Sequence, residues 1–426
     1  MSSIQSLRGT KDIFSNDIGY WHLIEKTARE VFHTINYQEI RTPVLENSDL
    51  FERGIGLSTD IINKEIYSFI DKGNRSIALR PEGTASIARA FIQNKLYGLN
   101  LINKLWYLGP MFRYERPQGG RQRQFHQLGV EVIGSSNPLV DVEVISLATK
   151  MLNQLNISNY CKEINSLGTL EERQKYKNSL VQYLLPYKYD LDNDSQSRLK
   201  SNPIRILDTK DNKTLEIISH APNINQYLGL ESRAHMEEIC NCLAELNISF
   251  QLNPKLVRGL DYYNNTAFEI KTSELGAQDT ICGGGRYDNL IKQLGGPETP
   301  AVGWAIGIER LLIILKNQIN LEINQVDFYI ISDSKKTQLE SIKLAELLRE
   351  KGYSVEVDLS NKNFSKQIKR ANQYNSIACI IFGETEFINN NFQVKWLKDY
   401  LQESFSISEI NILVSQLNKR KLNLNT

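Results

Sequence analysis

The fold is decided by residues 105–134, which read LWYLGPMFRYERPQGGRQRQFHQLGVEVIG. Both ends of this stretch predict strands, since 106–114 is rich in aromatic residues and 125–133 alternates between two kinds of side chain. A proline- and glycine-bearing loop separates them. Because side chains alternate along a strand, Gln127 and Glu131 share one face of the second strand. The stretch therefore predicts strand, loop and strand.

The loop of this hairpin is strongly basic. Four arginines flank it, namely Arg113, Arg116, Arg121 and Arg123. Arginine is suited to a bidentate grip on phosphate. Together with inward polar side chains, the arginines predict a site that holds a polyanion beside a small polar molecule. An exposed charged hairpin is the alternative interpretation.

Length and composition set the bounds for the remaining chain. The 426 residues indicate two or three domains, and a hydrophobic content of 41% is ordinary for a globular chain. A net charge of +1 neither requires nor excludes nucleic acid, because a basic groove can lie on a neutral protein. The longest apolar run, 311–315, is too short to span a membrane. The first residues resemble no targeting segment, so we expect the chain to work where it is made.

The five cysteines are scattered along the chain. Cys240 and Cys242 form one isolated pair, which is too little for a zinc site. We therefore expect neither a disulfide framework nor a metal site built from protein side chains.

The first 50 residues predict a helix followed by a strand. Apolar residues recur near a 3.6-residue period over 17–36, and 37–46 reads as a strand interrupted by Pro43. Proline cannot donate to a sheet ladder, so Pro43 belongs at a sheet edge or where the strand leaves its sheet. An edge strand after a long helix suggests a subunit contact.

Three further segments carry candidate site residues. Glu82 and Thr84 occupy the first turn of a helix predicted over 82–93, where they either cap the helix or receive an ammonium group. The glycines after Cys282 indicate either close approach to a ligand or a turn. Arg310 follows a glycine-bearing segment on a predicted helix, and a buried arginine there requires an anion partner.

The second half of the chain changes character twice. Residues 170–245 predict an inserted helical module, and from 326 onward strands alternate with helices, as in a mixed-sheet α/β domain of usual size. In that domain a helix over 335–350 is predicted, with Gly352 after its end. Its expected inward residues are Leu339, Ile342, Leu347 and Leu348. A later group, Lys366, Lys369 and Arg370, either touches phosphates or forms a solvated helix face.

Taken together, these motifs closely resemble those of the histidyl-tRNA synthetases, a class II aminoacyl-tRNA synthetase family. Segments 37–46, 112–125 and 303–311 are similar to the three class II motifs, the first being the dimer element that includes Pro43. The segments RPEGT (80–84) and RGLDYY (258–263) are similar to signatures of the histidine-specific enzymes. The resemblance is weak only near 170–245.

The resemblance implies an α+β fold with two parts. Residues 1–325 would form the class II catalytic core around an antiparallel sheet, with the helical insertion at about 170–245. Residues 326–426 would form a C-terminal α/β anticodon-binding domain.

The resemblance also implies a role for each candidate residue. Histidine would be bound by Glu82, Thr84, Arg113, Gln127, Glu131, Arg258, Tyr262 and Tyr263. ATP would be bound by Arg113, Glu115, Arg121, Phe125 and Arg310. The acceptor end of tRNA(His) would contact Arg116, Gln118 and Arg123. Arg113 and Arg258 would be the catalytic residues.

The implied activity is a ligase reaction. L-histidine and ATP would give histidyl-adenylate and pyrophosphate, with Mg²⁺ on the phosphates, and histidine would pass to the 3′ end of tRNA(His). A pocket polar at both ends rejects other amino acids by roughly 10⁴-fold or more, so we expect no editing. The enzyme would be a homodimer without membrane contact, in the cytoplasm or, if organelle-encoded, in the chloroplast stroma.

Two other functions fit parts of the pattern. One is a histidine-binding regulator, a paralogue type that lacks the C-terminal domain and has eroded arginine motifs. The other is a tRNA-binding or sensor module on an inactive core. Arg113, Arg258 and Arg310 disfavour both.

Overall fold

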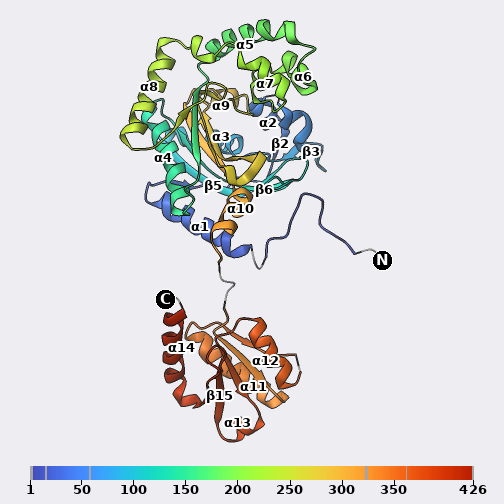
Figure 1. Ribbon diagram of the computed structural model, residues 1–426, viewed down its shortest axis with the longest axis vertical. Coiled ribbons are helices and arrows are strands. Elements are labelled where there is room, and N and C mark those ends of the chain that lie inside the picture. Colours follow the sequence, from blue (N-terminus) through green and yellow to red (C-terminus); the bar gives the residue numbers. More distant parts are fainter. Residues whose placement is uncertain (1–2, 15–16, 57–58, 322–324, 361, 425–426) are drawn as a thin grey trace. The chain divides into compact units, whose positions relative to one another are not determined.

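The computed structural model describes residues 3–14, 17–56, 59–321, 325–360 and 362–424. The chain forms two compact units, Met1–Leu321 and Glu322–Thr426 (Figure 1). Among the described residues no helix is long and apolar enough to cross a membrane.

The first unit is built on an eight-stranded sheet. Its order is β1 (Gln38–Glu39), β5 (Asn103–Phe112), β6 (Gln124–Ile133), β11 (Ala301–Gly307), β10 (Thr280–Arg286), β9 (Asn264–Lys271), β7 (Cys161–Ser166) and β8 (Gln251–Leu252). The six central strands are antiparallel, and the two edge strands pair in parallel. The hairpin predicted from 105–134 is confirmed as β5 and β6.

Helices cover both faces of this sheet. The helices α1 (Ile18–His33), α4 (Pro138–Gln154) and α10 (Ile308–Gln318) pack on one face, where Leu128, Val130 and Val132 join the largest apolar core. Helices α3 (Thr84–Gln93) and α9 (Leu290–Gln293) pack on the other. The alternation predicted along 125–133 is therefore confirmed, and it leaves the second face of β6 available for a site.

The strand expected at 37–46 is instead two strands in different sheets. After β1, β2 (Leu45–Asn47) joins a small sheet with β4 (Ser76–Leu79) and β3 (Tyr67–Ile70). Pro43 lies between β1 and β2, where the chain leaves the large sheet. The expected interruption at Pro43 is confirmed, because a proline cannot continue the hydrogen-bond ladder. Helix α2 (Ser48–Ile55) follows β2 directly.

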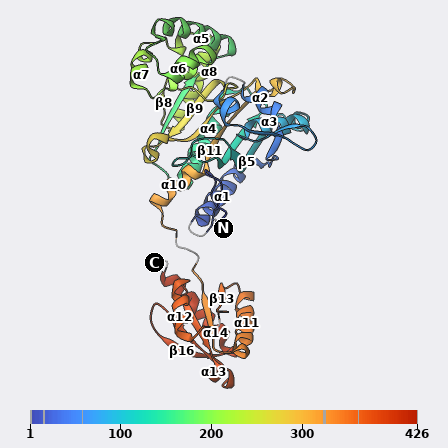
Figure 2. The same ribbon diagram turned by 90° about the vertical axis from the view of Figure 1, so that its right-hand side faces the viewer.

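The segment expected to be a helical insertion is largely helical and has its own apolar core. It contains α5 (Leu170–Leu184), α6 (Asn193–Ser201), α7 (Asn212–Ser219) and α8 (Leu230–Glu245), with a 3₁₀ turn at Pro203–Asp208. Tyr176, Leu180 and Ile218 are fully buried within it. Figures 1 and 2 both show α5, α6 and α7 gathered at one end of the first unit.

The second unit is a mixed five-stranded sheet between helices. The order is β13 (Val355–Val357), β12 (Phe328–Ser332), β14 (Ala378–Phe382), β15 (Asn391–Trp396) and β16 (Gln402–Ser406). The first three strands are parallel and the last two antiparallel. Helices α11 (Lys335–Glu350) and α14 (Ile410–Leu424) pack on one face and α12 (Phe364–Gln373) on the other. Strand β16 and helix α13 (Glu384–Ile388) were not predicted.

Helix α11 corrects one sequence expectation. Of the four residues expected to point inward only Leu348 is buried, and Leu339 is 56% exposed. The buried stripe instead contains Thr337, Ser341, Leu344, Ala345 and Leu348, which recur every three to four residues along one face of the helix. Gly352 follows the helix with a φ of +86°, as predicted for its C-terminal end.

Candidate active site

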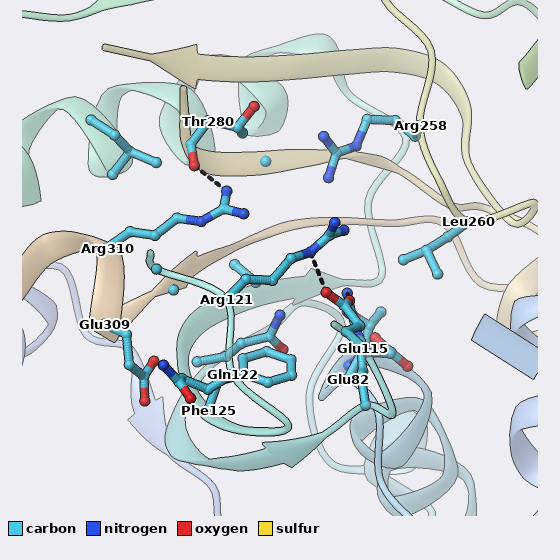
Figure 3. A pocket seen from close by; sticks show the side chains of 18 of the residues that line it. Glu82, Glu115, Arg121, Gln122, Phe125, Arg258, Leu260, Thr280, Glu309 and Arg310 are labelled. Carbon is cyan, nitrogen blue, oxygen red and sulfur yellow. Dashed lines mark hydrogen bonds and ion pairs between the residues drawn. The ribbon is translucent and has the colours of Figure 1, made fainter. Parts of the chain in front are cut away.

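The first unit encloses a cavity of about 200 Å³ on the open side of β6 (Figure 3). Strands β6, β10 and β11, the start of α3, the start of α10 and the hairpin loop all contribute to its wall. The candidate histidine- and ATP-binding residues in this wall are Glu82, Thr84, Arg113, Glu115, Arg121, Phe125, Gln127, Arg258, Tyr262, Tyr263 and Arg310. Residues spread over more than 220 positions of sequence therefore meet at one place.

Glu82 both caps a helix and lines the cavity. Its two carboxylate oxygens accept hydrogen bonds from the backbone N–H groups of Thr84 and Ala85, each at 2.8 Å. The Tyr262 hydroxyl donates to the same carboxylate at 3.4 Å. Burial raises the pKa of Glu82 above its ordinary value, while the backbone donors oppose that shift. The capping interpretation is thus confirmed, and it leaves the carboxylate at the cavity wall.

Glu131 is not part of the cavity lining, but it contacts Thr84, which is. The Thr84 hydroxyl donates to one of its oxygens at 2.7 Å, and the Tyr287 hydroxyl donates to the other. Burial raises the pKa of Glu131 to about 8, although both hydrogen bonds act in the opposite direction. Tyr287 was not singled out from the sequence, since no local pattern marks a tyrosine that follows a glycine-rich strand as the partner of a distant carboxyl.

A buried carboxylate organises the arginines of the hairpin. Glu115 forms an ion pair with Arg121. A carboxylate oxygen of Glu115 also lies 3.9 Å from a guanidinium nitrogen of Arg113. Arg113 also donates to the carbonyl of Pro81 at 2.9 Å, and its guanidinium lies 5.2 Å from the centre of the Phe125 ring. These contacts hold two positive groups and one aromatic face beside each other.

Arg258 approaches the cavity from another side. It forms an ion pair with Glu269, and its guanidinium lies 5.4 Å from the centre of the Tyr263 ring. Burial lowers the pKa of Arg258, but the charge of Glu269 and the neighbouring tyrosines outweigh burial and raise the pKa above its ordinary value. The side chain is therefore a permanent cation.

The glycine run after Cys282 makes room for this arginine. Residues 283–285 lie within β10, so the turn interpretation was wrong. A Cβ atom at Gly283 would lie 2.3 Å from a terminal nitrogen of Arg258, which is closer than atoms can approach. Gly283 therefore allows the guanidinium to lie against the strand.

Arg310 completes the positive lining from the start of α10. It donates a hydrogen bond to the carbonyl of Thr280 (Figure 3). Burial lowers its pKa, and the nearby charge of Arg121 lowers it further. Four arginines and three carboxylates line the cavity, so its wall carries net positive charge, which an anionic ligand would neutralise.

The three candidate tRNA contacts lie outside this cavity. Arg116 and Gln118 are exposed on the hairpin loop. Arg123 lies 3.9 Å from the ring centre of Tyr114, and its backbone N–H donates to the carbonyl of Gly9 at 2.7 Å. The segment around Gly9 thus packs against the hairpin.

The structure also bears on metal binding. No cluster of three or more histidine, cysteine, aspartate or glutamate side chains that could hold a metal ion is found in the described part of the chain. Glu115 and Glu309 nevertheless place carboxylate groups at the cavity wall.

An antiparallel sheet flanked by helices, with arginines from a hairpin and from a helix around one cavity, defines the catalytic core of a class II aminoacyl-tRNA synthetase. Comparison with known protein families shows which family within this class the chain matches. The histidyl-tRNA synthetase family model matches residues 9–171 and 191–311, and the anticodon binding domain model matches residues 325–417.

Individual proteins agree with these matches. A histidine–tRNA ligase from a Picosynechococcus strain is 53% identical over 410 residues, covering 96% of each chain. The chloroplastic histidine–tRNA ligase of Gracilaria tenuistipitata var. liui is 56% identical over 399 residues, covering 94% of this chain and 95% of its own. The solved structure of apo S. aureus histidyl-tRNA synthetase is 36% identical with a TM-score of 0.79, covering 96% of this chain and 98% of its own. The chain belongs to the histidyl-tRNA synthetase family.

Proposed function

We propose that this histidine–tRNA ligase joins L-histidine to the α-phosphate of ATP in the cavity and then transfers histidine to the 3′ end of tRNA(His). The observation that carries the proposal is the meeting of four arginines with Glu82, Thr84 and Gln127 around one cavity. A carboxylate and a triphosphate repel each other, and this lining supplies the charge that brings them together.

The polar end of the cavity is suited to the histidine ammonium group. The side-chain oxygen of Gln127 is buried and, within the described residues, has no hydrogen-bond donor. A buried acceptor without a donor is costly, so it favours a ligand with N–H groups. Glu82 and Thr84 would complete this contact. Glu131 and Tyr263 would contact the two imidazole nitrogens, and Tyr262 would line that pocket.

The arginines are suited to the phosphates. Arg113 and Arg258 would contact the α-phosphate and the histidine carboxylate from two sides. The carboxylate oxygen attacks the α-phosphorus, the bond to the β-phosphate breaks, and pyrophosphate leaves with the electron pair. No general base is required because a carboxylate is already ionised at neutral pH. Catalysis is then positioning plus stabilisation of growing negative charge.

The remaining ATP contacts use the hairpin and α10. Phe125 would stack on adenine, with Arg310 on the other face of the base and towards the γ-phosphate. Arg121 would contact the terminal phosphates. Glu115 pairs with Arg121 and Glu309 accepts hydrogen bonds from His126, so an Mg²⁺ ion that arrives with the nucleotide would be held mainly by the phosphates. Bound Mg²⁺ would neutralise phosphate charge.

Residues outside the cavity would bind the tRNA and the second subunit. Arg116, Gln118 and Arg123 would contact the acceptor end of tRNA(His), and residues 326–426 would contact the anticodon, as the family match at 325–417 supports. The region around Pro43 would lie in a homodimer interface. The relatives come from cyanobacteria and chloroplasts, which supports either the cytoplasm or the chloroplast stroma.

The direct test is histidine-dependent exchange of pyrophosphate into ATP by the purified chain. We expect exchange in the wild type and a loss of about 10²–10³-fold in Arg258→Ala, because a charge that stabilises the transition state is removed. Circular dichroism should match the wild type, although the thermal midpoint should fall because Glu269 loses its buried partner. A fall of only a few-fold would show that Arg258 is not catalytic, and an inactive folded wild type would leave a binding function.

A further inference from the structure

The segment that carries Arg258, Tyr262 and Tyr263 has no regular secondary structure. Residues 256–263, named here the arginine loop, lie between β8 and β9 without helix or strand hydrogen bonds. Buried backbone carbonyls require hydrogen-bond partners. In this loop those partners are side chains from elsewhere in the chain.

Most of the partners found come from the helical insertion. The carbonyl of Leu256 accepts from Asn165 of β7 at 3.0 Å. Arg205 donates to the carbonyl of Gly259 at 3.0 Å. Arg173 donates with its two terminal nitrogens to the carbonyls of Asp261 at 3.0 Å and Tyr263 at 2.5 Å. Three of these four carbonyls are thus held by two arginines of the insertion.

The space behind the loop makes these two arginines important. A second cavity of about 270 Å³ separates the insertion from the loop, and Arg173, Lys177 and Arg205 line it. Arg258 and Leu260 line both this cavity and the active-site cavity. Tyr262 and Tyr263 pack into an apolar core on the active-site side of the loop. On the insertion side the loop meets this cavity, and hydrogen bonds from Arg173 and Arg205 restrain its backbone there.

We propose that Arg173 and Arg205 are positioning residues for amino-acid activation, because they hold the backbone of the arginine loop in place. The proposal rests on the role of Arg258 given under the proposed function. A displacement of about 1 Å at a reacting centre can cost on the order of 100-fold in rate. The insertion therefore acts on the first chemical step, in addition to any contact that it makes with tRNA.

The insertion offers a matched control. Arg233 of α8 also donates to two backbone carbonyls, those of Leu228 at 2.9 Å and Asn225 at 3.2 Å. Both acceptors belong to the insertion itself. Arg173→Gln and Arg233→Gln therefore remove the same kind of contact, but only the first frees the arginine loop.

The experiment measures pyrophosphate exchange for both variants with ATP and histidine varied separately. For Arg173→Gln we expect kcat to fall by about 10- to 100-fold while the KM for ATP changes by less than about threefold. Arg233→Gln should keep the wild-type kcat. Thermal midpoints are measured for both, so that a general loss of stability is recognised by equal effects on the two variants.

Arg205 supplies a second, independent variant pair. It makes a single contact with the loop, so Arg205→Lys should keep most of the activity and Arg205→Leu should lose it. Arg173 bridges two carbonyls, so Arg173→Lys should restore little. Arg173→Gln should cost much less kcat in an Arg258→Lys background than in the wild type, because both changes act through the same group.

The outcomes separate this inference from the proposed function. Equal kcat for Arg173→Gln and Arg233→Gln, with Arg258→Ala inactive, would overturn the inference and leave the proposed function intact. Full activity of Arg258→Ala would overturn the role of Arg258 and the inference with it. Equal losses in Arg205→Lys and Arg205→Leu would also contradict the inference.

Discussion

Glu131 shows how the environment of one residue sets its chemistry. Its carboxyl is 1% exposed, and hydroxyl groups of Thr84 and Tyr287 contact its two oxygens. With its pKa raised to about 8 by burial, the carboxyl holds its proton to higher pH than an exposed glutamate does. A neutral acid can donate a hydrogen bond as well as accept one. In the histidine site proposed above, such a group would match an imidazole ring, which has one nitrogen of each kind.

This pKa predicts a pH dependence of stability. The pKa of Glu131 rises from 4.5, its ordinary value, to about 8 in the folded chain, so the folded state holds the proton more tightly. The tighter proton binding stabilises the folded chain fully below about pH 4.5. This stabilisation is lost as pH rises through about 8. Glu131→Gln cannot titrate. We expect its thermal midpoint to rise relative to the wild type between pH 5 and pH 8.5, as followed by calorimetry.

The measurement needs Glu82 left intact, because burial raises the pKa of that carboxyl as well. Glu298→Gln is a suitable control, since this carboxyl is exposed. Parallel midpoint curves for Glu131→Gln and the wild type across this pH range would contradict the raised pKa.

At the scale of elements, two adjacent glycines of strand β10 face opposite sides of the sheet and have different roles. Gly283 faces the cavity and the guanidinium of Arg258. Gly284 faces the core, where a Cβ atom would lie 2.4 Å from the backbone carbonyl oxygen of Gly303 and 2.6 Å from the Cβ of Trp304. One alternating strand thus serves both the site and the packing.

We predict that alanine at these two positions has different consequences. Gly283→Ala displaces the flexible end of Arg258, so pyrophosphate exchange should fall at least about tenfold with little change in stability. Gly284→Ala forces backbone to move and should destabilise the chain by about 1–3 kcal/mol. Gly98→Ala is the control, since no atom lies within 4 Å of its added Cβ. Urea unfolding and exchange assays distinguish the cases, and a reversed pattern would contradict the assignment.

At the scale of the whole molecule, each unit has its own apolar core. Apolar side chains of Ile24, Val130 and Leu311 are buried in the first unit, and those of Phe328, Leu348 and Leu413 in the second. The cavity residues all belong to the first unit. Activation and tRNA selection are therefore expected to be separable.

A chain that ends at Leu321 tests this separation. We expect it to fold and to retain histidine-dependent pyrophosphate exchange within a few-fold, because every lining residue is kept. Aminoacylation of tRNA(His) should fall by at least about tenfold, since the anticodon contacts proposed for the second unit are lost. Lys366→Ala in the full chain is measured beside it, because this variant removes one candidate phosphate contact and keeps the second unit. A folded truncated chain without exchange would show that the second unit supports the catalytic site.

Local patterns in the sequence determined much of this protein. The period of apolar residues determined α1, the alternation along 125–133 determined which face of β6 meets the core, and the order of arginines indicated a site for anions. These features depend on neighbours in the chain, so they can be read without knowing the fold. The same local reading was wrong for Leu339 in α11, because burial there depends on the sheet that the helix meets.

Only the tertiary structure decided the contacts between distant segments. Tyr287 meets Glu131 across 156 positions, and Arg173 meets Tyr263 across 90. Neither pair leaves a periodic or local signal, because a hydrogen bond between remote residues depends on how strands and insertion pack. The raised pKa of Glu131 likewise follows from burial, which is a property of the folded chain.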